Sequence, residues 1–179
     1  MYDESLKMPL IVKWPGMAKP GSVNNQLVQN LDYAETFLDI AGVPVPGDMQ
    51  GQSLVPLLKG TTPDDWRKSF YYQYYEFPGG HSVARHYGVT DGKHKLINYY
   101  QLEEWELFDL EKDPNELNNM YGQGDYDEIQ KKLLTELEQL RKQYKLPDED
   151  PAETHRRGGK KPQLQKGKGK AKAEKKKAA

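Results

Sequence analysis

The side chain best placed for chemistry in this sequence is His86, which stands in a stretch, residues 69–97, that holds three of the chain's four histidines. In an extended segment successive side chains point to opposite faces. His86 then shares its face with small residues, Ser82, Ala84, Gly88 and Thr90, whereas Arg85 shares the other with Val83, Tyr87 and Val89. A side chain that can become cationic, surrounded by small residues, could line a cleft for an anionic ligand. Spacing alone favours the simpler alternative, an exposed or hydrogen-bonded histidine of a sheet.

Three strands must position this stretch. Residues 70–76 are rich in aromatic side chains, which suit a pleated, half-buried surface. Proline and glycine then interrupt the chain, and the pattern predicts further strands at residues 82–90 and 93–99. The Asp91-Gly92 pair between them predicts a hairpin with a two-residue type I′ turn, in which both central residues have positive φ.

A fourth strand and a long helix complete this part of the chain. Residues 105–110, WELFDL, predict the strand, and residues 126–144 predict the helix. The helix should lie across the sheet on one apolar stripe, because leucine and isoleucine recur at helical spacing. The stripe consists of Ile129, Leu133, Leu137 and Leu140.

The first third of the chain predicts two kinds of element. Residues 9–14, PLIVKW, form a nearly continuous apolar run that fits a buried strand. Residues 31–41 predict a helix of the hydrophobic core, followed by Gly42 where a C-terminal cap is expected. Residues 53–58 predict one or two further helical turns.

Charge divides the 179-residue chain into two unequal parts. Residues 156–179 hold 11 of the 26 Lys and Arg residues and a single acid, so an acidic body carries a basic tail. The composition predicts that residues 146–179 are disordered. The tail could bind polyanions or anionic membranes, but nucleic acid is disfavoured because no aromatic side chains are interleaved with the lysines.

Several classes of site are excluded. The chain has no cysteine, so it can form neither a disulfide framework nor a thiolate metal site. It has no apolar run of roughly 18 residues, so no membrane span is expected. Phosphate-binding loops, His-x-x-x-His pairs and Gly-x-Ser-x-Gly elbows are missing, and acidic clusters fall in predicted loops. The N-terminus lacks the pattern of a signal peptide, and its abrupt start suggests that the chain begins within a larger protein.

Four separate phrases follow one another along the chain: YDESLKMP, AGVPVP, GQSLVPLL and LFDLEKDPNELNN. Their wording and order resemble the C-terminal part of formylglycine-dependent type I sulfatases, and the resemblance runs from residue 1 to about residue 144. It implies an α/β enzyme with an α+β C-terminal part. Residues 1–66 would hold the last strand and helix of the catalytic domain. Residues 67–145 would form a four-stranded antiparallel sheet with a packed helix, and residues 146–179 a disordered Lys-rich tail.

The resemblance also implies a site. The substrate would be a sulfated carbohydrate, the region from Tyr71 to Tyr87 would form one wall of its cleft, and His81, Arg85 and His86 would contact sugar or sulfate. Calcium and formylglycine are implied for the whole enzyme, and export to the periplasm or the medium is typical of the family. The Cys/Ser-x-Pro-x-Arg motif that yields formylglycine is absent from this chain, as are the Asp-rich metal motifs.

Two functions therefore stay open at this stage. In the first, the chain is the C-terminal part of a sulfatase, is inactive alone, and has the N-terminal catalytic portion of the same enzyme as its partner. In the second, it is a stand-alone module that binds sulfated glycans or other polyanions through its sheet and basic tail.

Overall fold

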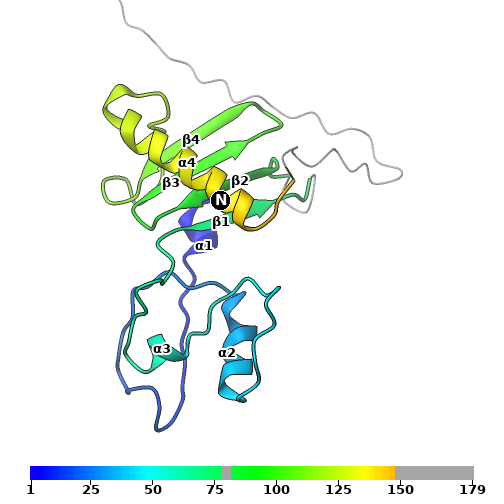
Figure 1. Cartoon of the computed structure of the whole chain (residues 1–179). Helices are drawn as coiled ribbons and strands as arrows, with labels where there is room; N and C mark the ends of the chain where they lie inside the picture. The colour runs from blue at the N-terminus through cyan, green and yellow to red at the C-terminus, as the bar shows by residue number, and fades with distance from the viewer. Residues whose placement is uncertain (78–81, 148–179) are drawn as a thin grey trace, which may run out of the picture.

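The computed structural model describes residues 1–77 and 82–147, and its centre is a four-stranded sheet (Figure 1). The strands β1 (Phe70–Tyr74), β2 (His86–Thr90), β3 (His94–Tyr99) and β4 (Glu104–Asp109) follow one another in sequence order, and each neighbouring pair is antiparallel. Helix α4 (Asp127–Gln143) lies across one face of this sheet (Figure 1). The predicted antiparallel sheet with a C-terminal helix is confirmed.

Two details of the β2–β3 hairpin differ from the prediction. Strand β2 begins at His86, because residues 82–85 are not paired and Ser82 has a φ of 51°. The turn has Gly92 and Lys93 at its tip, and only Gly92 has positive φ, which is the pattern of a type II′ turn. Asp91 instead precedes the tip, where its carboxylate accepts the backbone N–H groups of Lys93 and His94.

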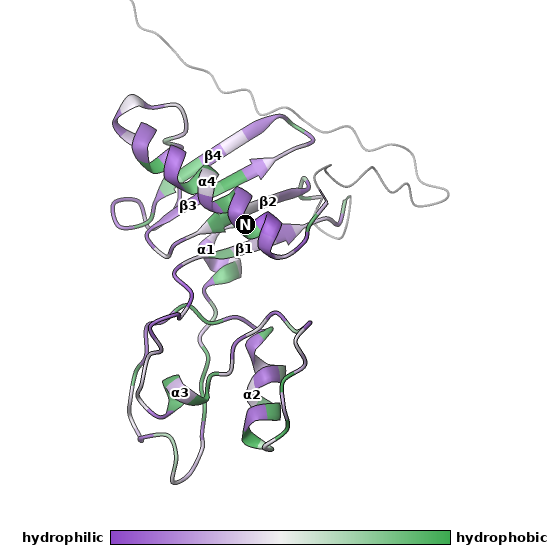
Figure 2. Ribbon diagram, in the orientation of Figure 1, coloured by the Kyte–Doolittle hydropathy of each residue, from purple (hydrophilic) through white to green (hydrophobic). Residues whose placement is uncertain are grey.

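The main hydrophobic core lies between the sheet and α4. Leu133 and Leu137 of the predicted stripe are buried against the strands, as is Leu140, while the outer side of α4 is hydrophilic (Figure 2). The helix therefore forms where its periodicity predicts, because its apolar side has a partner in the same chain. The buried members of this core are Tyr87, Val89, Leu96, Leu107, Leu133, Leu137 and Leu140.

The N-terminal third holds short helices joined by long coil segments. These helices are α1 (Asp3–Leu6), α2 (Asp32–Ile40) and α3 (Val55–Leu58), and the 3-10 turn η1 (Gly124–Tyr126) precedes α4. In Figure 1, α2 and α3 lie in the half of the molecule away from the sheet, whereas α1 lies beside β1. A small core of Leu54, Leu57 and Trp66 holds α3 in place.

Two predictions for this third are wrong. Residues 9–14 form coil rather than a strand, and Ile11 is 91% exposed. Helix α2 forms, but its buried side chains are Asp32, Glu35 and Thr36, while Phe37 on its apolar side is 69% exposed. Both errors have one physical reason: among the described residues no strand pairs with residues 9–14 and nothing covers the apolar side of α2. The polar side is buried instead, because Asp32 forms a bidentate ion pair with Arg67.

Candidate functional site

The sheet face opposite α4 carries the polar chemistry of the molecule. Strand β3 sends Leu96 toward α4 and its neighbours Lys95 and Ile97 to the opposite side, because side chains alternate along a strand. We call this opposite side the α1 face, since the short helix α1 lies on it. Its described side chains are Tyr72, Tyr74, His86, Lys95, Ile97, Tyr99, Glu106 and Phe108.

His86 is buried at the centre of a group of tyrosines on this face. Its side chain is almost wholly covered, and its ring stacks on Tyr74 with 5.4 Å between centroids and tilts against Tyr99 at 5.0 Å. The small neighbours on β2 leave space, as predicted, but tyrosines from the flanking strands fill it. The open cleft that the strand's own residues suggest is therefore roofed by aromatic rings.

The hydrogen bonds of His86 define its chemical state. The Nδ1 atom lies 2.7 Å from the backbone oxygen of Ala84, and because a carbonyl only accepts, Nδ1 carries the proton. Burial is the main cause that lowers the pKa of His86 to about 4, so the ring is neutral at pH 7. The Nε2 atom is then an acceptor, and within the described residues it has no hydrogen-bond partner. This histidine suits a hydroxyl or amide donor rather than an anion.

The other two predicted site residues are placed differently. Arg85 directly precedes β2 and is 3% exposed. His81 lies outside the described residues. The structure therefore buries both Arg85 and His86, the first just before β2 and the second at its start, and the role of all three residues as contacts to sugar or sulfate stays a prediction.

A glycine on β2 makes room for a buried phenol. A side chain at Gly88 would have its Cβ only 2.7 Å from the Oη atom of Tyr72 and 2.2 Å from the backbone oxygen of Leu96. Tyr72 can therefore lie across the strand two residues from His86. Burial raises the pKa of Tyr72 well above its usual value, so its hydroxyl stays protonated and can act as a donor.

The start of the chain closes part of the α1 face. Tyr2 donates a hydrogen bond from its hydroxyl to the Oε2 atom of Glu106 over 3.1 Å, and its ring meets that of Phe108 edge-on. Burial raises the pKa of Glu106, and burial followed by the charge of Glu106 raises the pKa of Tyr99. These groups form a partly buried, hydrogen-bonding surface beside His86.

A buried ion cluster anchors the same segment, and sequence reasoning missed it. The Nζ atom of Lys95 lies 2.7 Å from a carboxylate oxygen of Asp3 and 2.7 Å from one of Glu116, and the lysine side chain is wholly buried. The three residues come from three distant parts of the sequence. Only one signal was available: Asp3 and Glu116 each stand in one of the phrases shared with sulfatases.

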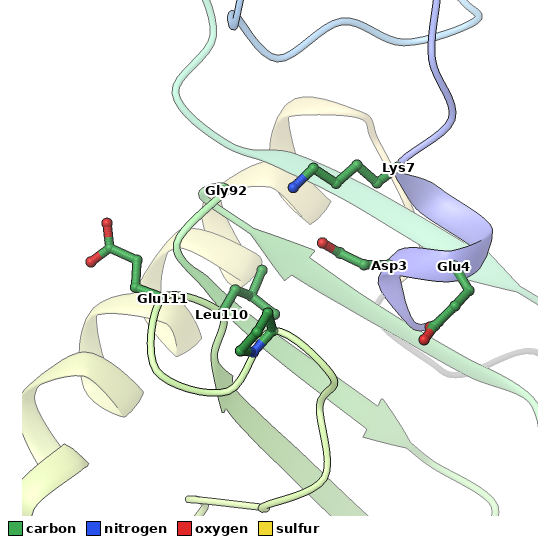
Figure 3. Close-up of a pocket in the computed structure, with 7 residues that line it drawn as sticks. Asp3, Glu4, Lys7, Gly92, Leu110 and Glu111 are labelled. Atoms are coloured by element: carbon green, nitrogen blue, oxygen red, sulfur yellow. The ribbon is translucent and has the colours of Figure 1, made fainter.

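A cleft of about 460 Å³ opens next to this cluster (Figure 3). Asp3 and Lys7 reach toward it from the α1 side, and Glu111 stands on the opposite side, on the loop after β4 (Figure 3). The donor set does not fit a calcium ion, because within residues 1–77 and 82–147 no three His, Asp or Glu side chains converge as metal ligands. No helix in the described part of the chain is long and apolar enough to span a membrane.

Comparison with known proteins identifies the family to which this chain belongs. Residues 1–143 match the family model described as N-sulphoglucosamine sulphohydrolase, C-terminal. The chain belongs to this sulfatase family. It is 50% identical over 157 residues to the N-acetylglucosamine-6-O-sulfatase of Bacteroides thetaiotaomicron, with 86% of this chain and 28% of the relative covered. It is 35% identical over 125 residues to arylsulfatase K of Rattus norvegicus, with 67% of this chain and 22% of that protein covered.

A solved structure gives the same assignment. It is 48% identical in sequence, has a TM-score of 0.73, and covers 75% of this chain and 28% of the solved one. That structure is described as a complex with its substrate D-glucosamine-2-N,6-O-disulfate. The chain thus spans between 22% and 28% of the length of these relatives and corresponds to the C-terminal region of the family.

Proposed function

We propose that this chain is the C-terminal part of a sulfuric ester hydrolase that removes sulfate from a sulfated sugar. The observation that carries the proposal is its 50% identity, over 86% of its length, to a protein named N-acetylglucosamine-6-O-sulfatase. A glucosamine derivative with a 6-O-sulfate is therefore the substrate class to test first. The likeness to a structure described with a disulfated glucosamine substrate supports the same class.

In this proposal the chain contributes a wall of the substrate cleft and no nucleophile. The sequence has no cysteine, and none of its serines stands in a Ser-x-Pro-x-Arg context, so formylglycine would belong to the N-terminal catalytic portion. The calcium ligands would lie there too, because the described residues offer no suitable donor set. Location in the periplasm or outside the cell follows from the family and is part of the proposal.

The α1 face is the wall that we assign to the substrate. In this proposal the Nε2 atom of His86 accepts a hydrogen bond from a sugar hydroxyl or amide, which reaches it when the tyrosine rings that cover it move aside. Arg85 is assigned to sulfate from its place beside His86 in the sequence, because a guanidinium carries the complementary charge. His81 is assigned to the same wall from its place in the sequence. Tyrosines around His86 add flat apolar surfaces suited to the faces of a sugar ring.

The N-terminal catalytic portion is also the partner that we assign to the exposed apolar surface. Ile11 in the coil and Phe37 on α2 are 91% and 69% exposed, and both belong to segments with strand or helix periodicity. Single exposed apolar residues are common, but contiguous ones mark an interface. Pairing of residues 9–14 with a neighbouring strand would satisfy their backbone and bury Ile11, and a further packing surface of the same portion would cover Phe37.

The test is sulfate release by the complete polypeptide that carries this C-terminal part. We expect it to release sulfate from N-acetylglucosamine 6-sulfate, and we expect the 179-residue chain alone to release none. A complete enzyme that hydrolyses neither this sugar nor an aryl sulfate would contradict the proposal. Salt-sensitive heparin binding by the chain that survives deletion of residues 146–179 would favour the stand-alone binding module instead.

A further inference from the structure

Three segments that are far apart in the sequence meet at one buried lysine. Lys95 on β3 reaches Asp3 on α1 and Glu116 in the loop after β4, each over 2.7 Å. The lysine side chain is 0% exposed and that of Glu116 is 1% exposed. We call these three residues the Lys95 cluster.

Glu116 uses both carboxylate oxygens within the cluster. One oxygen accepts from Lys95, and the other accepts the backbone N–H of Asp3 over 2.6 Å. Glu116 holds a left-handed backbone conformation with a φ of 53°, which is unusual for this residue type and is kept where surrounding contacts enforce it. The preceding Asp113 supports the loop by accepting the N–H groups of Leu117 and Asn118.

Helix α1 depends on this cluster for its place. It has four residues, no side-chain cap and no fully buried residue, so apolar burial within the helix fixes it only weakly. Its other attachments are the contacts of the preceding Tyr2 with Glu106 and Phe108 and the packing of partly buried Met1 and Leu6. The ion pair of Asp3 with Lys95 and the hydrogen bond from its backbone N–H to Glu116 are therefore its main directional contacts.

We propose that Lys95 is a positioning residue for the sulfatase reaction. Through Asp3 and Glu116 it fixes α1 on the sheet and holds Met1 and Tyr2 against the α1 face, so that the surface around His86 and Glu106 keeps one shape. This inference rests on the proposed function, because it takes the α1 face as the wall that meets substrate. It explains why Asp3 and Glu116 stand within phrases that this chain shares with sulfatases.

The chemistry of the cluster suits positioning better than stability. A buried ion pair often contributes little net stability compared with apolar residues of the same size, because both charges lose their hydration. A buried ion pair does, however, make every arrangement unfavourable in which its two charges separate inside the protein, because each charge would then be buried without a partner. A four-residue helix that could otherwise shift by an ångström is thereby restricted to one position, and misplacement on that scale can slow catalysis about 100-fold.

The experiment compares three variants of the complete enzyme that contains this chain. Asp3→Asn is the main variant, because Lys95 keeps Glu116 as its partner and the sheet should still fold. Lys95→Met removes the centre of the cluster. Lys132→Met is the matched control, since that lysine pairs with Asp91 over 3.0 Å, lies on α4 and is 66% exposed. The two readouts are kcat/KM for N-acetylglucosamine 6-sulfate and hydrogen–deuterium exchange of the peptide covering residues 1–8.

For Asp3→Asn we expect kcat/KM to fall roughly tenfold, on the scale of a small misplacement, with faster exchange in residues 1–8 and little change in melting temperature. Lys132→Met should change neither readout. Wild-type kcat/KM in Asp3→Asn, with or without faster exchange, would overturn the positioning role. If the unsubstituted enzyme released no sulfate, the proposed function and the positioning role would both fall, and exchange would still show whether the cluster holds α1.

Discussion

The two faces of the sheet are built from alternate residues of the same strands, yet they differ in almost every physical respect. Toward α4, Val89, Leu96 and Leu107 meet a leucine stripe and the interface is apolar. Toward α1, the same strands present His86, Lys95 and Glu106 with several tyrosines. One face buries apolar area against a 17-residue helix, and the other is partly covered by a four-residue helix held by an ion pair and a hydrogen bond of Asp3.

The difference separates stability from chemistry. Apolar burial on the α4 face contributes favourable free energy without directional requirements. Each titratable group on the α1 face must instead find a partner or lose stability through desolvation. Such groups persist where a function needs them, and the α1 face is accordingly where we place substrate. The contrast can be tested by changing one face at a time.

The largest effect is expected for Lys95→Met on the α1 face. The change removes the positive charge of the Lys95 cluster and leaves the carboxylates of Asp3 and Glu116 close together without a compensating charge. Loss of one partner of a buried pair typically costs about 3–5 kcal/mol of unfolding free energy. Urea unfolding of the 179-residue chain measures this loss. A Lys95→Met/Glu116→Gln double variant should recover part of it, and an equally unstable double variant would argue against the ion pair.

The matching change on the α4 face is Leu133→Ala. Leu133 is 0% exposed at the middle of the helix interface, and truncation would leave a cavity between α4 and the sheet. Large-to-small changes of this kind cost about 2–5 kcal/mol, and we expect a value near the middle of that range. The exposed neighbour Lys131→Ala serves as control in the same urea series. Unchanged stability in Leu133→Ala would mean that α4 does not pack as described.

A smaller effect is expected where the α1 face is tightest, at Gly88→Ala. The new Cβ would meet the Leu96 oxygen and the Tyr72 hydroxyl, so the strand and the phenol must move apart. Overpacking of this kind costs about 1–3 kcal/mol. If Tyr72 is the obstacle, Gly88→Ala should be better tolerated in a Tyr72→Ala background, as a double-mutant cycle in thermal unfolding would show.

The smallest effect is expected for the pH dependence of unfolding, which depends on His86 of the α1 face and leaves the packing of both sheet faces unchanged. The folded-state pKa of His86 is lowered to about 4 from 6.5, so the unfolded chain binds its proton first as pH falls. The neutral His86 ring therefore makes its full contribution to the free energy of unfolding above pH 6.5. That contribution is lost progressively as the pH falls from 6.5 to about 4. The urea midpoint should fall from pH 7 to pH 5, and His86→Phe should show a weaker fall. Leu133→Ala should keep the full pH dependence.

Periodicity predicted those elements whose partners lie within the chain. The four strands and α4 cover one another, so alternation and the leucine stripe were sufficient. The strand at residues 9–14 and the buried apolar side of α2 were mispredicted, because the same patterns have no partner among the described residues. Hydrophobic periodicity indicates which side of a segment could be buried. Whether that side is buried depends on a packing partner elsewhere in the protein.

The site was less accessible to prediction than the fold. His86 could be placed on a small-residue face of β2, but the tyrosines that cover it come from β1 and β3 and depend on strand register. The turn between Asp91 and His94 differed by one residue because the Asp91 carboxylate caps the hairpin from outside its tip. The Lys95 cluster joins residues up to 113 positions apart, a relation that no local spacing reveals.

The measurement that tests the central claim most directly is the mass of the native polypeptide that contains this sequence. Intact mass spectrometry after immunoprecipitation, followed by peptide sequencing, would give it. Our account predicts a mass well above 20.6 kDa and a formylglycine-bearing peptide upstream of Met1. A native polypeptide of 20.6 kDa would contradict the assignment as part of a sulfatase and would favour a separate glycan-binding module.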